Sequence, residues 1–248
     1  MAFAAPGDDG TIVYEPYHTR SGVSVAANLR QALADDALPG GSRDSVLVTT
    51  DAPVLLVPAE EYAADAAERL YAYTYGADKS SAVAAAPMAG EGVVALFAVN
   101  RDLRQVLADR FADVRLVPLM LTVWEHFHRQ SFSAQHRRLF AYVCGKTLHL
   151  SLFRHNRFDF CNSFTAPDTP DALYYVLNVW RQTGLKADAD ELVVVGNGTD
   201  ALASAAREYL RHVTERAPAT EFGAAHAALT EGLPFDLQTL FLKKIVSQ

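Results

Sequence analysis

The chain has 248 residues, of which 50% are hydrophobic and 21% are charged, as in ordinary globular proteins. This length allows one large domain or two lobes with a substantial core. The formal net charge is −7. Nucleic-acid binding proteins need clustered basic charge to neutralise phosphates, so we expect no nucleic-acid partner.

The two cysteines, Cys144 and Cys161, form no CxxC pair and no Cys/His metal spacing. We therefore expect two buried thiols in an intracellular protein, and no metal site. The first residues, Met1–Pro6, do not resemble a secretory signal. No apolar run approaches the ~20 residues that a membrane helix needs. We expect a cytoplasmic protein without membrane insertion.

In the first half, hydrophobic periodicity predicts a strand, a helix and a second strand at 11–17, 24–34 and 46–50. A strand and helix insertion is expected at 54–57 and 58–73, with Glu60-Glu61 at the start of that helix. Small and polar residues at 76–92 predict a mobile loop. The remaining elements alternate strand and helix, at 93–99, 101–111, 114–117 and 119–129.

In the second half, period-two alternation predicts three antiparallel strands, at 138–144, 147–153 and 157–164. Tight turns at Gly145-Lys146 and at His155-Asn156 join them. Asp168 or Thr169 is expected to cap the next helix. The later elements are that helix, a strand that is apolar throughout as in parallel sheets, and two more helices, at 170–183, 192–196, 199–213 and 234–246.

This order of elements is typical of a ribonuclease-H-like lobe, and the first half follows a looser version of the same plan. We therefore predict two lobes, an incomplete N-terminal one at 1–133 and a C-terminal one at 134–248. A complete lobe begins with two hairpin-linked strands before the one at 11–17, but only nine residues precede position 10. Either the first strand is absent, or the sequence begins downstream of the true start.

Three segments carry a resemblance to a known family: Phe158–Phe164, Asp171–Trp180 and Glu191–Asn197, with fainter matches at 27–29 and 56–58. In these the chain resembles the DUF3822 family, uncharacterised bacterial proteins, mostly from Bacteroidetes. More distantly it is similar to PilM-type actin-like proteins. The resemblance implies an α/β actin-like ATPase fold. Its two ribonuclease-H-like lobes have mixed sheets flanked by helices, and the first lobe lacks its first strand.

The resemblance also implies where a phosphate site would lie. Actin-like ATPases carry an Asp two residues before a glycine in the first hairpin of each lobe, and this Asp organises Mg²⁺ and the phosphates. In the second lobe the glycine is Gly145, but the Asp position is Val143. A branched apolar side chain holds no metal, so we expect a degenerate phosphate turn at Gly145, no metal and no catalytic residues.

A second turn, Gly196-Asn197-Gly198, allows three interpretations. With Thr199 to Ala201 it fits the G-x-G-x-x-A pattern of dinucleotide-binding proteins. It is also a tight turn in which Thr199 or Asn197 caps the next helix. By resemblance, it is the turn on the adenosine side of actin-like proteins, with Gly196, Asn197 and Gly198 as binding residues.

Two histidines on one predicted helix, His126 and His128, point away from each other and are expected at the surface. With no catalytic set apparent, we expect a protein without enzymatic activity and without a cofactor. Its expected role is that of an interaction or scaffold module for an unknown protein partner. The alternative is an ATP-binding protein or slow ATPase that uses the cleft between the lobes. The sequence makes no prediction of the oligomeric state.

Overall fold

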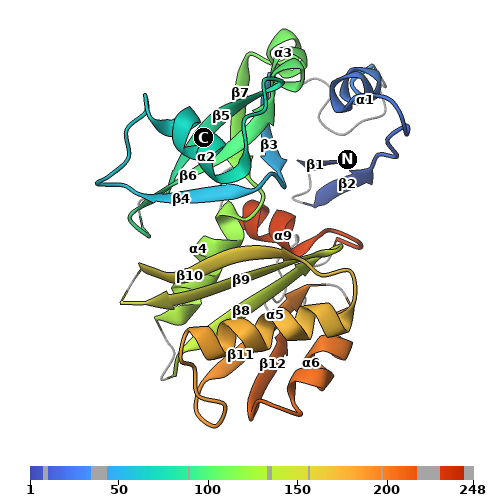
Figure 1. Cartoon of the computed structure of the whole chain (residues 1–248). Helices are drawn as coiled ribbons and strands as arrows, with labels where there is room; N and C mark the ends of the chain where they lie inside the picture. The colour runs from blue at the N-terminus through green and yellow to red at the C-terminus, as the bar shows by residue number, and fades with distance from the viewer. Residues whose placement is uncertain are drawn as a thin grey trace. The chain divides into compact units, whose positions relative to one another are not determined.

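The computed structural model describes residues 1–7, 11–34, 44–88, 90–132, 136–155, 157–196, 198–216 and 230–242. The chain divides into two compact units (Figure 1). Unit 1 contains the described residues of Met1–Leu121 and of 229–233. Unit 2 contains those of Thr122–Ala228 and Pro234–Lys243. Both units combine strands with helices, so the α/β class predicted from the sequence is confirmed.

Unit 2 is built on one five-stranded sheet with the order β10-β9-β8-β11-β12. The first three strands form an antiparallel meander, and β8, β11 and β12 run parallel. The strand bounds are β8 Arg138–Cys144, β9 Thr147–Arg154, β10 Arg157–Thr165, β11 Glu191–Gly196 and β12 His212–Arg216. The mixed sheet is the one that the order of elements predicts.

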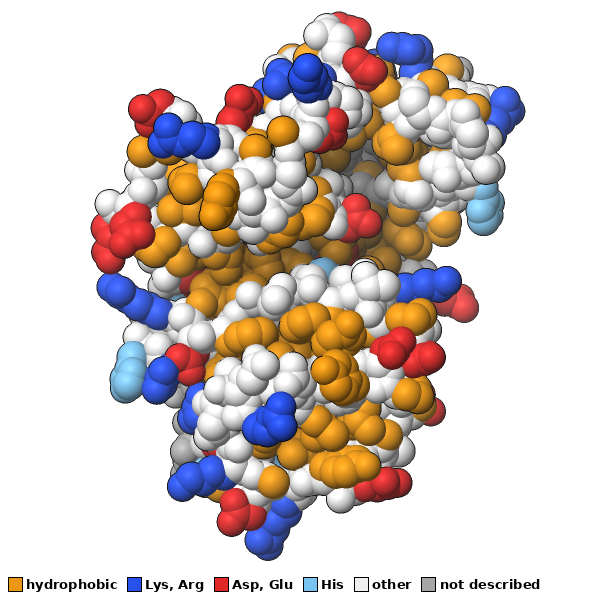
Figure 2. Space-filling model, viewed as in Figure 1, with side chains coloured by type: hydrophobic (Ala, Val, Ile, Leu, Met, Phe, Trp, Pro, Cys, Tyr) orange, Lys and Arg blue, Asp and Glu red, His pale blue; other side chains and the backbone are white. Residues whose placement is uncertain are grey.

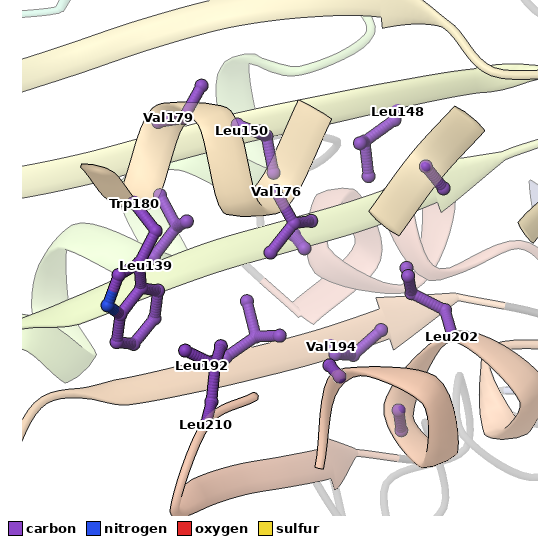
Figure 3. Close-up of a cluster of buried hydrophobic side chains, with 14 of the residues drawn as sticks. Leu139, Leu148, Leu150, Val176, Val179, Trp180, Leu192, Val194, Leu202 and Leu210 are labelled. Atoms are coloured by element: carbon purple, nitrogen blue, oxygen red, sulfur yellow. The ribbon is translucent and has the colours of Figure 1, made fainter. Parts of the chain in front are cut away.

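Helices α5 (Thr169–Gln182) and α6 (Asp200–Ala206) cover one face of this sheet (Figure 1). Asp168 caps α5, because its carboxylate accepts a hydrogen bond from the Asp171 amide at 3.0 Å. Side chains from both helices and from β8, β9 and β11 form a continuous apolar core (Figure 3). Burial alternates along the first half of β9 and is continuous along most of β11. This explains why the pattern of apolar residues predicted both strands.

The other face of the sheet packs against α4 (Leu121–Ser131) and α9 (Phe235–Leu242). The Phe127 ring on α4 stacks on Phe140 of β8, with ring centroids 4.6 Å apart, and on Phe235 of α9 at 6.0 Å. Helix α9 was predicted as 234–246, and its residues after Leu242 lie outside the described part. Strand β8 is thus the centre of the unit, buried on both faces.

Unit 1 contains the corresponding elements in two separate sheets. An antiparallel hairpin of β1 (Ala2–Pro6) and β2 (Ile12–Pro16) forms one sheet, and the parallel pair β3 (Ser45–Thr50) and β7 (Asp113–Pro118) forms another. Helices α1 (Val25–Ala32) and α3 (Arg101–Arg110) pack on both sheets through one apolar cluster. Strand β1 begins at Ala2, the second residue of the sequence.

The insertion in unit 1 differs from its prediction. It forms a three-stranded antiparallel sheet of order β4-β6-β5 with one helix, with the bounds β4 Val54–Pro58, α2 Ala67–Tyr75, β5 Ser81–Met88 and β6 Val93–Asn100. The loop predicted at 76–92 is therefore wrong, because β5 pairs with β6 along its whole length. Helix α2 begins only at Ala67, so Glu60 and Glu61 lie in a turn rather than at a helix start.

The helix predicted at 199–213 is also wrong in its second half. Helix α6 ends at Ala206, and His212–Arg216 forms β12, paired in parallel with β11. No glycine or proline separates the two elements in the sequence, so local signals gave no boundary. In the same unit, His155 has a φ of +50° at the predicted turn, while Asn156 and residues 133–135 lie outside the described residues.

Candidate functional site

The predicted site glycines lie at the carboxyl ends of β8 and β11. Parallel pairing places Gly196 opposite Val143, and Gly145 follows two residues after Val143 in the β8–β9 turn. The structure thus brings the two predicted turns to the same edge of one sheet. In parallel sheets this carboxyl edge is where ligands usually bind. The middle residue of the Gly196-Asn197-Gly198 turn, Asn197, lies outside the described residues.

Gly145 has a local structural role in its hairpin. Cys144 pairs with Thr147, so the turn has two central residues, and Gly145 at the first of them has a φ of +58°. This is the position that requires glycine in a type II′ hairpin turn. A Cβ on Gly145 would meet no atom within 4 Å. The space beside the turn is therefore open, and the backbone conformation alone accounts for the glycine.

Gly196 is required by close packing between two strands. Its φ is +129°, and a Cβ at this position would lie 2.3 Å from the carbonyl oxygen of Val143. Real Cβ atoms do not approach a backbone oxygen so closely, and side-chain-bearing residues rarely adopt this φ. A glycine is therefore needed here whether or not a ligand binds. The side chain of Val143 itself packs against the core of unit 2.

The turn from Gly198 to α6 uses its polar groups within the protein. Thr199 is buried, and its hydroxyl donates to the Glu215 carboxylate on β12 at 2.8 Å. Thr199 lies at the N-cap position of α6, but its side chain makes no capping hydrogen bond, and the other predicted cap, Asn197, lies outside the described residues. The interpretation of the G-x-G-x-x-A pattern as a phosphate-binding turn stays a prediction, since Asn197 lies outside the described residues.

No carboxylate cluster accompanies these turns. Among the described residues, no group of three or more His, Cys, Asp or Glu side chains is placed to hold a metal ion. Cys161 on β10 forms no disulfide, and burial raises the pKa of its thiol. It is therefore protonated and a poor nucleophile at neutral pH.

A buried polar contact joins α9 to β8 on the second face of the sheet. The Tyr142 hydroxyl donates to the Asp236 carboxylate at 3.0 Å, and both residues are buried. Burial raises the pKa of Asp236, although the hydrogen bond from Tyr142 opposes this, and burial beside Asp236 raises the pKa of Tyr142. The sequence analysis did not single out this pair, because the partners are 94 positions apart.

Two adjacent arginines, Arg137 and Arg138, form ion pairs within unit 2. Arg138 binds Glu191 of β11 at 2.6 Å, and Arg137 binds Asp159 of β10 at 3.0 Å. Burial alone would raise the pKa of Glu191, but hydrogen bonds from Thr214 and Arg138 outweigh it, so the pKa is lowered. These contacts join strands within one sheet.

One histidine was predicted wrongly. His128 is buried on α4, with its ring 5.2 Å from that of Phe153. Its interior position follows from the packing of α4 on the sheet, which the spacing of two histidines could not reveal. The neighbouring His126 packs its ring edge to face against Phe235, at 5.8 Å. Both rings are part of an aromatic cluster.

A model of the family DUF3822, proteins of unknown function, matches residues 4–213. The chain belongs to the DUF3822 family. This confirms the resemblance carried by the segments around Phe158, Asp171 and Glu191. A search among curated proteins found no match to the chain.

Two solved structures support the fold of this DUF3822 chain. One is a Bacteroides thetaiotaomicron VPI-5482 protein with an actin-like ATPase fold and unknown function. It aligns with a TM-score of 0.77 at 18% identity, over 94% of this chain and 88% of that one. The other is a PilM-PilN type IV pilus biogenesis complex, with a TM-score of 0.59 at 14% identity over 98% and 94% of the two chains. At these identities the likeness shows an actin-like fold alone. Within the described part of the chain, no helix is long and apolar enough to cross a membrane.

Proposed function

We propose that this protein is a non-catalytic interaction module that uses an actin-like fold to bind a protein partner. The observation that carries the proposal is the β8–β9 turn, where Val143 occupies the position of the carboxylate that would organise Mg²⁺. Its side chain belongs to the core of unit 2. An apolar branched side chain supplies no oxygen ligand for Mg²⁺, which prefers carboxylates and water. The proposal includes no cofactor.

Exposed aromatic side chains support a role in binding proteins. Tyr73 on α2 is 93% exposed, and Tyr174 on α5 is 63% exposed. Tyrosine is enriched in protein interfaces because it offers a large apolar surface with a polar end. One structural neighbour, PilM, occurs in a complex with another protein, PilN. This is a precedent for the fold in protein assembly.

Enzymatic assay with ATP and Mg²⁺ tests the absence of catalysis. We expect phosphate release from ATP to remain at the level of a buffer blank, with no dependence on Mg²⁺. Hydrolysis that requires Mg²⁺ and follows the protein concentration would overturn the proposal. A Val143→Asp variant, measured in parallel, tests whether restoring the carboxylate alone changes the result. We expect it to remain inactive, because among the described residues no group of three or more His, Cys, Asp or Glu side chains is placed to hold a metal ion.

The second candidate function is nucleotide binding at the Gly145 and Gly196 turns. It is favoured by their shared position at the carboxyl edge of the sheet and by the open space beside Gly145 and Gly198. Thermal unfolding with ATP, ADP and other nucleotides at about millimolar concentration distinguishes the two proposals, because a ligand that binds only the folded state raises the Tm. We expect no shift.

A matched pair of variants makes the nucleotide test specific. Gly198 has a φ of +66° and no atom within 4 Å of a Cβ, so Asn and Asp are both tolerated there. The two side chains have the same shape and differ in charge. If a nucleotide did raise the Tm, Gly198→Asp should abolish the shift by repelling phosphate while Gly198→Asn preserves it. A shift unaffected by either variant would place the nucleotide elsewhere.

A further inference from the structure

Helix α2 covers only part of the sheet on which it packs. The sheet has the order β4-β6-β5, and Tyr71 of α2 joins Val94 and Leu96 of β6 in a buried apolar cluster. Two residues after Leu96, on the same face of the sheet, Ala98 pairs directly with Val83 of β5. Both of these side chains are only half-buried. The apolar face of the sheet therefore continues beyond the area that the helix buries.

A pocket of about 250 Å³ opens to solvent at this point, within unit 1. Its apolar walls are formed by Val83 and Ala98 of the sheet and by Tyr71 and Ala72 of the helix. The two alanines are small, so the helix and the strand leave space between them. The Tyr71 hydroxyl donates to the Pro53 carbonyl at 2.8 Å, so this polar group is already used within the protein. Since a cavity of ~150 Å³ admits benzene, the pocket has room for a short apolar body.

The loop from α2 to β5 forms one rim of the pocket and is fixed by its own hydrogen bonds. The Asp78 carboxylate accepts hydrogen bonds from the Ser81 hydroxyl at 2.6 Å and from the Ser80 amide at 2.9 Å. These hydrogen bonds lower the pKa of Asp78, so its charge is present and is balanced by donors of the loop. The Arg101 amide at the start of α3 donates to the Ser80 carbonyl at 2.8 Å. An ordered rim reduces the entropy cost of binding a ligand.

Two basic side chains line the pocket, Lys79 in this loop and Arg101 at the start of α3. The Arg101 guanidinium is 3.8 Å from the Glu68 carboxylate, and the two side chains are 56% and 71% exposed, so their ion pair is weak. Among the described residues, the Lys79 ammonium makes no hydrogen bond or ion pair. Figure 2 shows basic and acidic side chains intermixed over the part of unit 1 that contains α2 and α3. A ligand here is therefore held by individual charges, among which Lys79 lacks a partner.

We propose that the pocket between α2 and the β5–β6 hairpin binds a carboxylate carried on a short apolar body. The apolar body packs on Val83 and Ala98, and the carboxylate accepts hydrogen bonds from Lys79 and Arg101. Small-molecule sites are usually apolar pockets with a few placed polar groups, and charge-assisted hydrogen bonds to a carboxylate are stronger than neutral ones. The inference goes beyond the proposed function, because it assigns a ligand to unit 1 and does not depend on the β8–β9 turn.

A matched pair of small ligands tests this chemistry. 4-Methylpentanoate and 4-methylpentanamide have the same apolar body and differ in charge. Each is titrated into the 248-residue chain, and NMR spectra follow the backbone amides. We expect the acid to shift the amides of Ala72, Lys79 and Val83 with a Kd of about 0.1–1 mM, since it has only about eight non-hydrogen atoms. The uncharged amide should bind at least about fivefold more weakly.

Protein variants on two sides of the pocket test the location. Lys79→Met removes the charge and Lys79→Arg keeps it, and we expect about a three- to fivefold loss of affinity for the first and less than about a twofold change for the second. Ala72→Leu should fill the pocket and abolish binding, whereas Ala72→Ser keeps a small side chain and should bind as wild type does. Thermal unfolding shows whether Ala72→Leu is folded. If it is not, the Lys79 pair on the exposed loop decides the test.

Two sources supply this ligand chemistry, a free organic acid and the C-terminal carboxylate of a polypeptide that ends in an apolar residue. An acetylated tripeptide of two alanines and a C-terminal leucine, compared with its C-terminal amide, distinguishes them. If the free-acid tripeptide binds more tightly than 4-methylpentanoate, the ligand is the C-terminus of a partner polypeptide. If it binds more weakly, the ligand is a free organic acid.

Three results would overturn the proposal. These are pocket amides that do not shift with 4-methylpentanoate at about 10 mM, equal affinities for the acid and the amide, and an affinity that Lys79→Met leaves unchanged. The assays of ATP hydrolysis and nucleotide binding concern turns of unit 2. Failure here is therefore distinguishable from failure of the proposed function.

Discussion

The two units show what one central strand contributes to an actin-like lobe. Unit 2 has a continuous sheet in which β8 is buried on both faces, whereas unit 1 has the flanking strands in two separate pairs. Both units have two helices that pack on the strands, α1 and α3 in unit 1 and α5 and α6 in unit 2. The apolar residues of β11 are fully buried, and those of β3 are half-buried. Among the described residues, the two units therefore share the order of elements from β1 and β9 onward, but not the degree of burial.

The largest expected difference between the units is in core packing. Leu150→Ala on β9 removes a fully buried side chain from the large cluster, and Leu29→Ala on α1 makes the same change in the small one. We expect losses of about 3–5 kcal/mol for Leu150→Ala and about 2–3 kcal/mol for Leu29→Ala, since a less enclosed site leaves a smaller cavity.

Chemical denaturation separates these two effects. Both tryptophans, Trp124 and Trp180, lie in unit 2, so their fluorescence follows that unit, while circular dichroism follows the whole chain. Leu150→Ala should shift both signals to lower denaturant, and Leu29→Ala mainly the circular dichroism. An equal loss of stability for the two variants would contradict the contrast between the units.

The next effect concerns the contact between β8 and β11, which has no counterpart beside β3. Gly196→Ala would force a Cβ against the Val143 carbonyl in an unfavourable backbone conformation, at about 2–4 kcal/mol. Gly145→Ala is the control, with an unfavourable φ but open space, and should cost about 1–2 kcal/mol. Thermal unfolding of both variants measures the difference. Similar losses would show that the close approach is unimportant.

The Asp236 contact to β8 should make the stability of unit 2 depend on pH. Burial raises the pKa of Asp236 above its unfolded value of ~3.9, so the folded state binds more protons between these two values. Stability contributed by the neutral carboxyl is present below pH ~3.9 and is lost as pH rises through the raised pKa. We expect Asp236→Asn to be more stable than wild type at pH 7, because the wild-type carboxyl must either stay protonated or be charged in a buried site.

Denaturation between pH 3 and pH 7 measures this effect. The advantage of Asp236→Asn should grow with pH, since Asn remains neutral and can accept the hydrogen bond from Tyr142. Tyr142→Phe is the complementary variant, and we expect it to lose about 1–2 kcal/mol by removing the donor. A constant difference between Asp236→Asn and wild type at all pH values would contradict the raised pKa.

The smallest effect concerns an ion pair that joins three strands of unit 2. Glu191 accepts hydrogen bonds from Arg138 of β8 and Thr214 of β12. Its pKa is lowered, so this contribution is present above the unfolded value of ~4.3 and is lost as pH falls through the lowered pKa. Glu191→Gln should cost about 0.5–1 kcal/mol at pH 7 and nothing at pH 2. If Glu191→Gln lost the same stability at pH 2 as at pH 7, the ionised carboxylate of Glu191 would not be the cause of the loss.

The sequence alone predicted the three strands of the meander, a cap on α5 at Asp168 or Thr169, of which Asp168 is the one observed, and the buried strand β11. In each case the signal is local, since alternation, a capping residue or a short apolar run is read within about ten positions. The family resemblance also depended on these segments. The resemblance placed Val143 at the Asp position before any coordinates, because Val143 lies two residues before Gly145 in a clear hairpin.

Other features were decided only by tertiary structure, because they depend on which strands become neighbours. Strand β5 was predicted as a loop, and it forms a hairpin with β6, the next strand along the chain. The helix predicted at 199–213 ran into the first residues of β12, a strand that is fixed by parallel pairing with β11 across α6. The requirement for glycine at 196 arises from the Val143 carbonyl, more than fifty positions away. Local pattern indicates which segments are able to form strands or helices, whereas the pairing of strands decides which of them do so and where close packing requires a glycine.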